Sequence, residues 1–260
     1  MSELNVLVEQ EGDVARLTLN RPNAHNAMNL AFMKDFRDGV AEIAKSKARA
    51  VVITGAGKAF SAGGDLSAFA DAPDSEALLL DMTDLLHEGI AGLVALDAPV
   101  VGAVNGIAAG AGLSLAASCD LVVAADSAKF TMAYTGAGLS PDGSSTYFVP
   151  RLIGMRRTQE LMFTNRLLSA EEALDWQLIN RIVPADSVVE EATKLAARLA
   201  AGPTRAFGAV KQMLLASSER SLHEQLKLEG QKIASLSVTP DGKEGISAFL
   251  EKRKPSFSGQ

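Results

Sequence analysis

The sequence predicts an α/β protein in which a strand-rich core is followed by a helical C-terminal region. Two observations predict this class: a unit of strand, small-residue loop and helix occurs twice in the first half, and the patterns from Thr146 onward are mostly helical. A chain of 260 residues with 47% hydrophobic residues is long enough to bury a proper core. We place the boundary near Gly202-Pro203, which divides the chain into segments 1–200 and 201–260.

The first unit is preceded by a hairpin, because apolar and polar residues alternate over Asn5–Glu9 and Val14–Asn20 on either side of Gly12. Apolar residues at helical spacing then predict a helix over Leu30–Lys45. A β-branched run predicts a strand over Ala50–Thr54, which ends in a loop rich in Gly and Ala.

The second unit follows a long helix predicted over Ala77–Leu96. It begins with a buried strand over Pro99–Val104 and continues through small residues into a helix that starts near Leu113. The remaining predicted elements are strands over Leu121–Ala125, Lys129–Met132 and Ile179–Val183, a loop over Gly136–Ser145, and helices over Gln159–Thr164, Ala170–Trp176, Val188–Ala200, Arg205–Ser217, Leu222–Leu236 and Lys243–Lys252.

Composition limits the function classes. The net charge of −6 argues against a surface for nucleic acid or for an anionic membrane. Cys119 is the only cysteine and the three histidines are dispersed, so neither a disulfide nor a metal-ligand spacing is present in the sequence. The first ten residues carry no apolar signal segment, and no run approaches the roughly 18 apolar residues of a membrane span. We therefore expect a cytoplasmic protein that binds neither nucleic acid nor membrane.

The stretch Asn105–Ala116 is the first candidate for a binding site. A strand, a small-residue turn and a helix N-terminus together direct unpaired backbone N–H groups at one point, where negative charge is stabilised. A tightly packed strand–helix turn without a ligand explains this stretch equally well. Gly110-Ala-Gly112 lacks the third small residue of a dinucleotide fingerprint, because position 115 is Leu.

Individual polar residues each allow two interpretations. Ser114 lies in a near match to the nucleophile elbow of serine hydrolases, although it is expected inside the helix and not at its entry. Asp142 follows Pro141 and is either a turn former or helix cap, or a nucleophile or proton shuttle on a loop. We interpret His87 as a partly buried histidine without a functional role. Asp65 is expected either to cap a helix or to contact a ligand. The basic residues Lys252–Lys254 are expected to form a solvated surface cluster.

Four stretches taken together resemble the enoyl-CoA hydratase/isomerase (crotonase) family. They are Arg21-Pro22 with Asn26-Ala27, Gly55 with Phe60–Leu66, Ala103–Gly106 with Ala109–Gly112, and Glu244-Gly245 with Ala248–Arg253, in family order over nearly the whole chain. The resemblance implies a crotonase-like spiral of repeated ββα units, with a C-terminal helical region used for trimerisation. It also implies an acyl-CoA thioester ligand, a homotrimer or dimer of trimers, and no metal or redox cofactor.

The resemblance assigns site residues by motif position. Two backbone N–H groups that polarise the thioester carbonyl map onto Gly64 and Ala111, and such donors are typically worth about 3–4 kcal/mol each. The positions implied to bind coenzyme A or the acyl group are Asn23, Ala24, His25, Ala62, Gly63, Asp65, Leu66, Gly110, Phe249 and Lys252. Lysines that the family often carries at positions 23 and 67 are here Asn and Ser.

The departures from the family pattern concern the chemistry. Family hydratases carry two glutamates at the positions of Ser114 and Tyr134, and neither residue replaces a carboxylate as a base near neutral pH. Asp142 matches the catalytic aspartate of two other branches. In phenylacetate-pathway enoyl-CoA isomerases it moves a proton between carbons. In chlorobenzoyl-CoA dehalogenase it attacks the substrate, the residue matching His87 activates water, and an aromatic at the position of Tyr134 lines the benzoyl pocket.

We therefore expect an enoyl-CoA isomerase that uses Asp142 as acid and base and an oxyanion hole at Gly64 and Ala111. Three alternatives stay open: hydrolytic acyl-CoA chemistry, either dehalogenation or thioester hydrolysis, that uses Asp142 and His87; hydration of an enoyl-CoA by unusual residues; and acyl-CoA binding without turnover.

Overall fold

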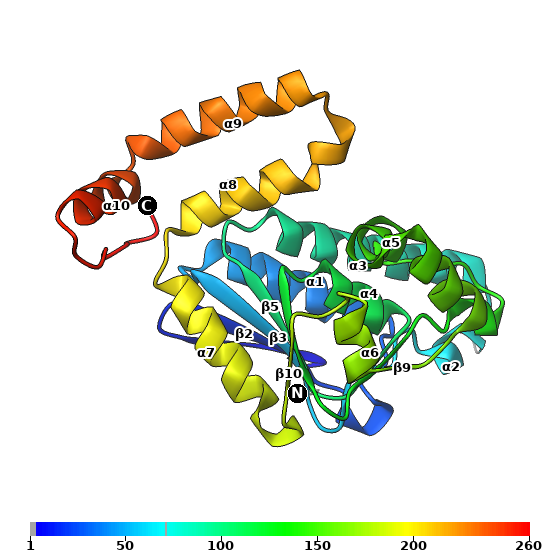
Figure 1. The fold of residues 1–260 in the computed structure, drawn as a ribbon. Coiled ribbons are helices and arrows are strands. Elements are labelled where there is room, and N and C mark those ends of the chain that lie inside the picture. The colour runs from blue at the N-terminus through cyan, green and yellow to red at the C-terminus, as the bar shows by residue number, and fades with distance from the viewer. Residues whose placement is uncertain (1–3, 71) are drawn as a thin grey trace.

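The computed structural model describes residues 4–70 and 72–260 and arranges its strands in two sheets (Figure 1). The larger sheet has the order β1-β2-β3-β5-β7-β10 and the smaller one β4-β6-β8-β9. The strands of the larger sheet are β1 (Val6–Glu11), β2 (Val14–Leu19), β3 (Ala50–Gly55), β5 (Val100–Val104), β7 (Leu121–Ala125) and β10 (Arg181–Val183). Those of the smaller sheet are β4 (Ala59–Ser61), β6 (Ile107–Ala109), β8 (Lys129–Thr131) and β9 (Leu168–Ser169).

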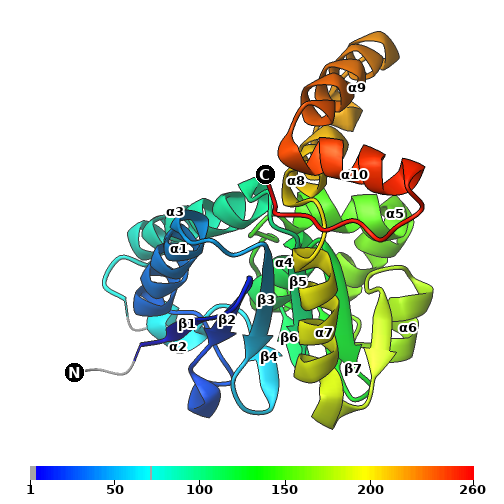
Figure 2. The same ribbon diagram turned by 90° about the vertical axis from the view of Figure 1, so that its left-hand side faces the viewer.

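Helices cover both sides of the larger sheet. The helices of the core are α1 (Leu30–Lys45), α2 (Leu66–Ala70), α3 (Ser75–Ala95), α4 (Ala111–Ser118), α5 (Ser145–Thr164), α6 (Ala170–Asp175) and α7 (Val188–Ala200). Short 3-10 turns are η1 (Pro22–Ala24), η2 (Tyr134–Ala137), η3 (Ala185–Ser187) and η4 (Ser217–Glu219). In Figures 1 and 2, α1 and α3 lie on one side of the sheet and α7 lies on the other.

The core is built from three structural repeats. In each repeat, a strand of the larger sheet is followed by a strand of the smaller sheet and then by a helix. The repeats are β3, β4 and α2–α3, then β5, β6 and α4, then β7, β8 and α5. Successive repeats pair in parallel, as Val51 does with Val100 and Val101 with Leu121. Every residue of β3 and of β5 is buried, as expected for parallel strands covered on both faces. The expected α/β class and the spiral of ββα units are confirmed.

A buried asparagine joins the loop around η1 to the start of β4. The Asn26 side chain is fully buried, and its Nδ2 donates to the carbonyl oxygens of Ala59 at 2.8 Å and Phe60 at 3.1 Å. Its Oδ1 accepts from the Arg21 N–H at 2.8 Å. Asn26 also has a φ of 55°, in the left-handed region that asparagine tolerates better than most residues.

Replacing Asn26 by Ala is expected to lower the free energy of unfolding by about 3 kcal/mol, because buried carbonyl and N–H groups would lose their partners. Urea denaturation followed by circular dichroism measures the change. Asn23, an exposed residue of the same segment, supplies the matched control, since Asn23→Ala should change stability by less than about 0.5 kcal/mol. Equal stability of the two variants would contradict the role given to Asn26.

The last three helices extend away from the sheets. They are α8 (Thr204–Leu215), α9 (Leu222–Ser237) and α10 (Pro240–Leu250), and Figures 1 and 2 show α9 and α10 standing off the core. Arg49, directly before β3, holds this region to the core, because its Nη2 donates to Gly202 O at 2.8 Å and to Phe257 O at 3.1 Å.

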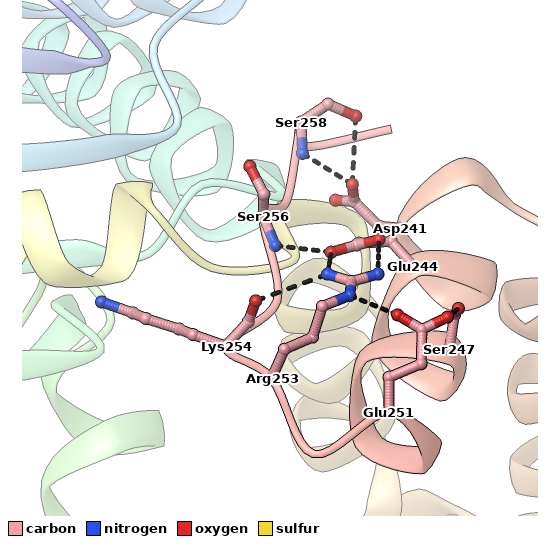
Figure 3. A network of polar contacts seen from close by, with 8 residues as sticks. All are labelled: Asp241, Glu244, Ser247, Glu251, Arg253, Lys254, Ser256 and Ser258. Atoms are coloured by element: carbon pink, nitrogen blue, oxygen red, sulfur yellow. Dashed lines mark hydrogen bonds and ion pairs between the residues drawn. The ribbon is translucent and has the colours of Figure 1, made fainter.

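The chain end folds back on α10 through the polar network of Figure 3. Buried Asp241 accepts from the backbone N–H groups of Ser258 and Gly259 at 2.7 and 2.8 Å. Arg253 forms ion pairs with Glu244 at 2.6 Å and Glu251 at 2.7 Å. Positions 252–254 are exposed, as expected for a solvated basic cluster, and the charge of Arg253 is in addition paired with two carboxylates.

The ion pair with Arg253 lowers the pKa of Glu244 to about 2. A carboxylate with a lowered pKa stabilises the fold above its ordinary pKa of 4.5, and that contribution disappears as the pH falls toward about 2. The network around α10 therefore persists at neutral and mildly acidic pH.

Several sequence-based expectations need correction. The helix expected over Gln159–Thr164 is the last part of α5, which begins at Ser145, so the loop expected over Gly136–Ser145 is shorter and starts with η2. Pro150 and a non-helical Gly154, with φ 77° and ψ 160°, interrupt the helical pattern of α5. The sequence pattern therefore did not predict the first half of this helix. The strands of the smaller sheet have two or three residues each, and most were too short to predict by periodicity.

Across residues 4–70 and 72–260, none of the helices combines the length and the apolar character that a membrane span requires.

Candidate active site

A cavity of about 530 Å³ lies between α2, α3, the start of α4 and the segment 133–142. It is lined by four of the five residues that the sequence predicts to be catalytic, namely Gly64, Ala111, Tyr134 and Asp142. The other lining residues are Met33, Ala62, Leu66, Phe69, Ser75, Glu76, Leu79, Leu80, Met82, Thr83, Leu86, Gly110, Ala133, Ala137, Leu139, Ser140 and Pro141. Most of these are apolar, so the cavity suits a largely hydrophobic ligand with a few polar contacts.

Two small-residue loops meet backbone to backbone at one end of the cavity. A Cβ added to Gly63 would lie 2.7 Å from Ala109 O and 3.2 Å from Ala111 N. Gly63 also has a φ of +89°, where other residues are strained. Glycine at this position is what allows the loop after β4 and the start of α4 to approach each other.

Each of these loops presents a backbone N–H that donates no hydrogen bond within residues 4–70 and 72–260. Met28 N–H donates to Gly63 O at 2.8 Å and Asp65 N–H donates to Met28 O at 3.0 Å, so the Gly64 N–H between them is left out of this pairing. Ala111 is the first residue of α4, and the N–H groups of a first helical turn have no intrahelical acceptor. Two such donors beside a helix N-terminus can stabilise developing negative charge on a bound oxygen.

Asp142 faces the same cavity from the loop before α5. Its side chain is 32% exposed, and its Oδ1 lies 2.7 Å from Nε2 of His87. Its backbone carbonyl accepts hydrogen bonds from the hydroxyls of Ser114 at 2.8 Å, Ser145 at 3.0 Å and Tyr134 at 3.3 Å. Asp142 is therefore not a helix cap: three hydroxyls hold its peptide, and its carboxylate contacts a histidine.

The loop that carries Asp142 adopts a strained backbone. Gly143 and Ser144 have φ values of 62° and 70°, and Ala133, which also lines the cavity, has a φ of 55°. Left-handed conformations cost non-glycine residues roughly 1–2 kcal/mol each. A Cβ at Gly143 would lie 3.1 Å from Ser114 Cβ, so the loop also packs closely on α4. Backbone strain of this kind is common at functional sites.

The hydroxyls of Tyr134 and Ser114 donate hydrogen bonds to the backbone carbonyl of Asp142, and neither side chain is a good base. Burial raises the pKa of Tyr134 to about 12, although hydrogen bonding to Ser114 opposes the shift, so the phenol stays protonated at neutral pH. Ser114 is fully buried within α4, and its hydroxyl contacts the carbonyls of Asp142 and Gly110. His223 lies on α9, outside the cavity lining. The serine hydrolase interpretation is wrong.

His87 differs from the partly buried histidine that its sequence context suggests. Its side chain is 50% exposed, it projects from α3, and it does not line the cavity. The structure does bring it to Asp142 across 55 positions of sequence. Sequence analysis missed Glu76, an exposed carboxylate at the start of α3 that also lines the cavity. Glu76 is at helical spacing from Leu79, Met82 and Leu86, which also line the cavity, and that spacing is the signal that could have identified it.

The residues expected to bind coenzyme A fall into two groups. The first group lies in and directly after η1 and consists of Asn23, Ala24 and His25. The backbone oxygen of His25 accepts a hydrogen bond from Ala62 N–H at 2.9 Å, so this group adjoins the loop 62–66. Asp65 is not the expected cap of α2, because its carboxylate pairs with Arg21 at 3.0 Å.

The second group lies apart from the cavity. Phe249 is 83% exposed near the end of α10, and Lys252 follows it at a φ of 54°. Figures 1 and 2 both place α10 at the opposite end of the chain's fold from α2, which lines the cavity. The structure thus does not bring Phe249 and Lys252 to the cavity of the same chain.

Comparison with known proteins gives one consistent result. The model of the enoyl-CoA hydratase/isomerase family matches residues 9–260. A probable enoyl-CoA hydratase of Rhodobacter capsulatus is 38% identical over 100% of both chains. The 1,2-epoxyphenylacetyl-CoA isomerase of Escherichia coli K12 is 38% identical over 98% of both chains. The crystal structure of an enoyl-CoA hydratase from Bacillus anthracis superposes with a TM-score of 0.91 at 31% identity, covering 98% of this chain and 100% of the other.

Proposed function

Because this chain belongs to the enoyl-CoA hydratase/isomerase family and is an acyl-CoA enzyme, we propose that it isomerises enoyl-CoA thioesters by proton transfer through Asp142. The observation that carries the proposal is the Asp142 carboxylate in the same cavity as the N–H groups of Gly64 and Ala111. A base and an oxyanion hole in one largely apolar cavity are the groups that proton abstraction next to a conjugated thioester requires.

The proposed reaction has two proton transfers. The N–H groups of Gly64 and Ala111 hold the thioester oxygen, and the Asp142 carboxylate removes a proton from C4, or from a carbon adjacent to a ring epoxide. The electron pair of the broken C–H bond delocalises to the thioester oxygen, which gives a dienolate. Asp142 then returns a proton to C2 and is a carboxylate again. A 3-enoyl-CoA undergoes the same two transfers in the opposite direction, so its proton is removed from C2 and returned to C4.

The presence of Ser114 and Tyr134 supports isomerisation as the proposed reaction more than hydration. They occupy the two positions at which the family resemblance places the glutamates that activate water. In this chain both hydroxyls donate to the Asp142 carbonyl, at 2.8 and 3.3 Å, so they position the loop of the proposed base. Neither supplies a carboxylate for water activation.

Hydrolytic chemistry is the second candidate, and the contact between His87 and Asp142 is the observation that favours it. In that reaction Asp142 attacks the substrate, and His87 activates water to hydrolyse the resulting ester. The cavity offers Phe69 and Tyr134 as its aromatic side chains, whereas most of its lining is aliphatic, which suits a benzoyl group less well.

We further propose that the chain works as a homotrimer or dimer of trimers, in which Phe249 and Lys252 reach the coenzyme A of a neighbouring subunit. Large apolar side chains exposed on α8, α9 and α10 and directly after α9 support this; they are Leu214, Leu222, Leu226, Ile233, Val238, Ile246, Phe249 and Leu250. Exposed apolar surface of this extent marks an interaction site. No metal or redox cofactor enters the proposed reaction.

A panel of thioesters tests the proposed reaction. The enzyme is incubated with a 3-enoyl-CoA, a 2-enoyl-CoA and a 4-halobenzoyl-CoA, and the products are separated and identified by mass. We expect an isomer of unchanged composition from the 3-enoyl-CoA. A product that has gained water would indicate a hydratase, whereas released halide or free coenzyme A would indicate the hydrolytic reaction. Binding without any product would indicate an acyl-CoA-binding protein.

A further inference from the structure

The contact between His87 and Asp142 connects the inside of the cavity with the outer surface of α3. Asp142 lines the cavity and its side chain is 32% exposed, whereas His87 does not line the cavity and its side chain is 50% exposed. Only 2.7 Å separates Asp142 Oδ1 from His87 Nε2. Within residues 4–70 and 72–260, no hydrogen bond is found to Asp142 Oδ2, so one carboxylate oxygen is held by the histidine and the other stays available to the substrate.

We propose that His87 is a positioning residue that carries protons between Asp142 and bulk water during isomerisation. The proposal rests on the proposed function, because it concerns the proton that Asp142 takes from an enoyl-CoA. It assigns His87 a role in proton transfer that requires neither covalent attack by Asp142 nor hydrolysis.

The relay is a sequence of balanced proton transfers. After Asp142 has taken the substrate proton, its carboxyl group turns so that the O–H faces His87 Nε2, with the ring proton on Nδ1. The O–H bond breaks and leaves its electron pair on the carboxylate, an Nε2–H bond forms, and the imidazolium releases its other proton to water. The reverse steps bring a solvent proton to Asp142, which delivers it to the dienolate, at C4 when the substrate is a 3-enoyl-CoA. Imidazole suits this task because it exchanges protons readily near neutral pH.

Among the side chains of residues 4–70 and 72–260 that hydrogen-bond to Asp142, His87 alone meets both requirements of this role. The hydroxyls of Ser114, Ser145 and Tyr134 contact the backbone carbonyl of Asp142 and not its carboxylate. Ser114 and Ser145 are also fully buried, which separates them from bulk water. His87 combines contact with the carboxylate and exposure to solvent.

The relay predicts where the hydrogen at C4 of the product comes from when a 3-enoyl-CoA is the substrate. In D₂O the enzyme converts a 3-enoyl-CoA, and the fraction of product that carries deuterium at C4 is measured by mass spectrometry during initial turnover. We expect most product of the unmodified enzyme to carry deuterium. His87→Gln should reduce that fraction to less than half, because glutamine still donates a hydrogen bond to Asp142 but cannot accept and release a proton.

Two further variants make the test decisive. His223→Gln replaces an exposed histidine of α9 outside the cavity lining and should leave the deuterium fraction unchanged. His87→Ala should lose deuterium incorporation and recover it when imidazole is added. An unchanged deuterium fraction in His87→Gln, or no recovery of His87→Ala with imidazole, would overturn the relay while the isomerase function stands. Absence of any isomer from the unmodified enzyme would overturn the proposed function itself.

Discussion

Replacing Asp142 by Asn is expected to lower kcat for isomerisation by about 10²–10⁴-fold, because a positioned acid and base contributes that much to catalysis. The amide has nearly the same shape, and the hydroxyl groups of Ser114, Ser145 and Tyr134 hold the backbone carbonyl and not the side chain. The loop should therefore stay in place, and the affinity for an acyl-CoA should change little. Steady-state kinetics and calorimetric titration with a non-reactive acyl-CoA measure the two quantities.

Two comparisons sharpen this prediction. Asp186→Asn alters an exposed aspartate of η3, which does not line the cavity, and should leave kcat unchanged. Glu76 is the other carboxylate of the cavity, so Glu76→Gln tests the competing base. Turnover by Asp142→Asn within about threefold of the unmodified enzyme, or a collapse of kcat in Glu76→Gln alone, would show that Asp142 is not the base.

Replacing Ala111 by Pro is expected to lower kcat by about 10²–10³-fold, the usual effect of removing one oxyanion donor. Ala111 is the first residue of α4, and proline is well tolerated at that position because its missing N–H has no partner in the helix. The substitution therefore removes the proposed donor at little expected cost to the fold. Steady-state kinetics gives the rate, and thermal unfolding shows whether the helix is intact.

The matched control is Ala111→Gly, which keeps the backbone N–H and removes only the methyl group. Its kcat should stay within about threefold of the unmodified enzyme. If the proline variant folds normally and also keeps its kcat, the Ala111 N–H does not stabilise the reacting oxygen.

Local patterns were sufficient to predict most of the core. Helical spacing placed α1 at Leu30–Lys45, a β-branched run placed β3, and the repeated strand-loop-helix unit fitted the repeats of the core. The strands β4, β6 and β9 were not predicted, because a strand of two or three residues is too short to show an alternation of apolar and polar residues. The first half of α5 was not predicted because proline and glycine, here Pro150 and Gly154, ordinarily indicate the end of a helix.

The candidate site was predictable as a set of residues and not as an arrangement. Motif positions indicated Gly64, Ala111 and Asp142, and all of them line one cavity. The exposure of His87 and its contact with Asp142 depend on how α3 packs against the loop before α5, which no local pattern encodes. The same holds for the pairing of Asp65 with Arg21, since the two residues are 44 positions apart.

The most direct test of the proton shuttle is the conversion of a 3-enoyl-CoA in D₂O by the unmodified enzyme and by Asp142→Asn, followed by mass spectrometry of substrate and product. We predict that the unmodified enzyme forms an isomer of unchanged composition that carries deuterium, and that Asp142→Asn forms neither the isomer nor labelled substrate at a comparable rate. Release of free coenzyme A without a labelled isomer would contradict the shuttle and favour hydrolysis by Asp142 and His87. Equal labelling by both enzymes would contradict the role of Asp142.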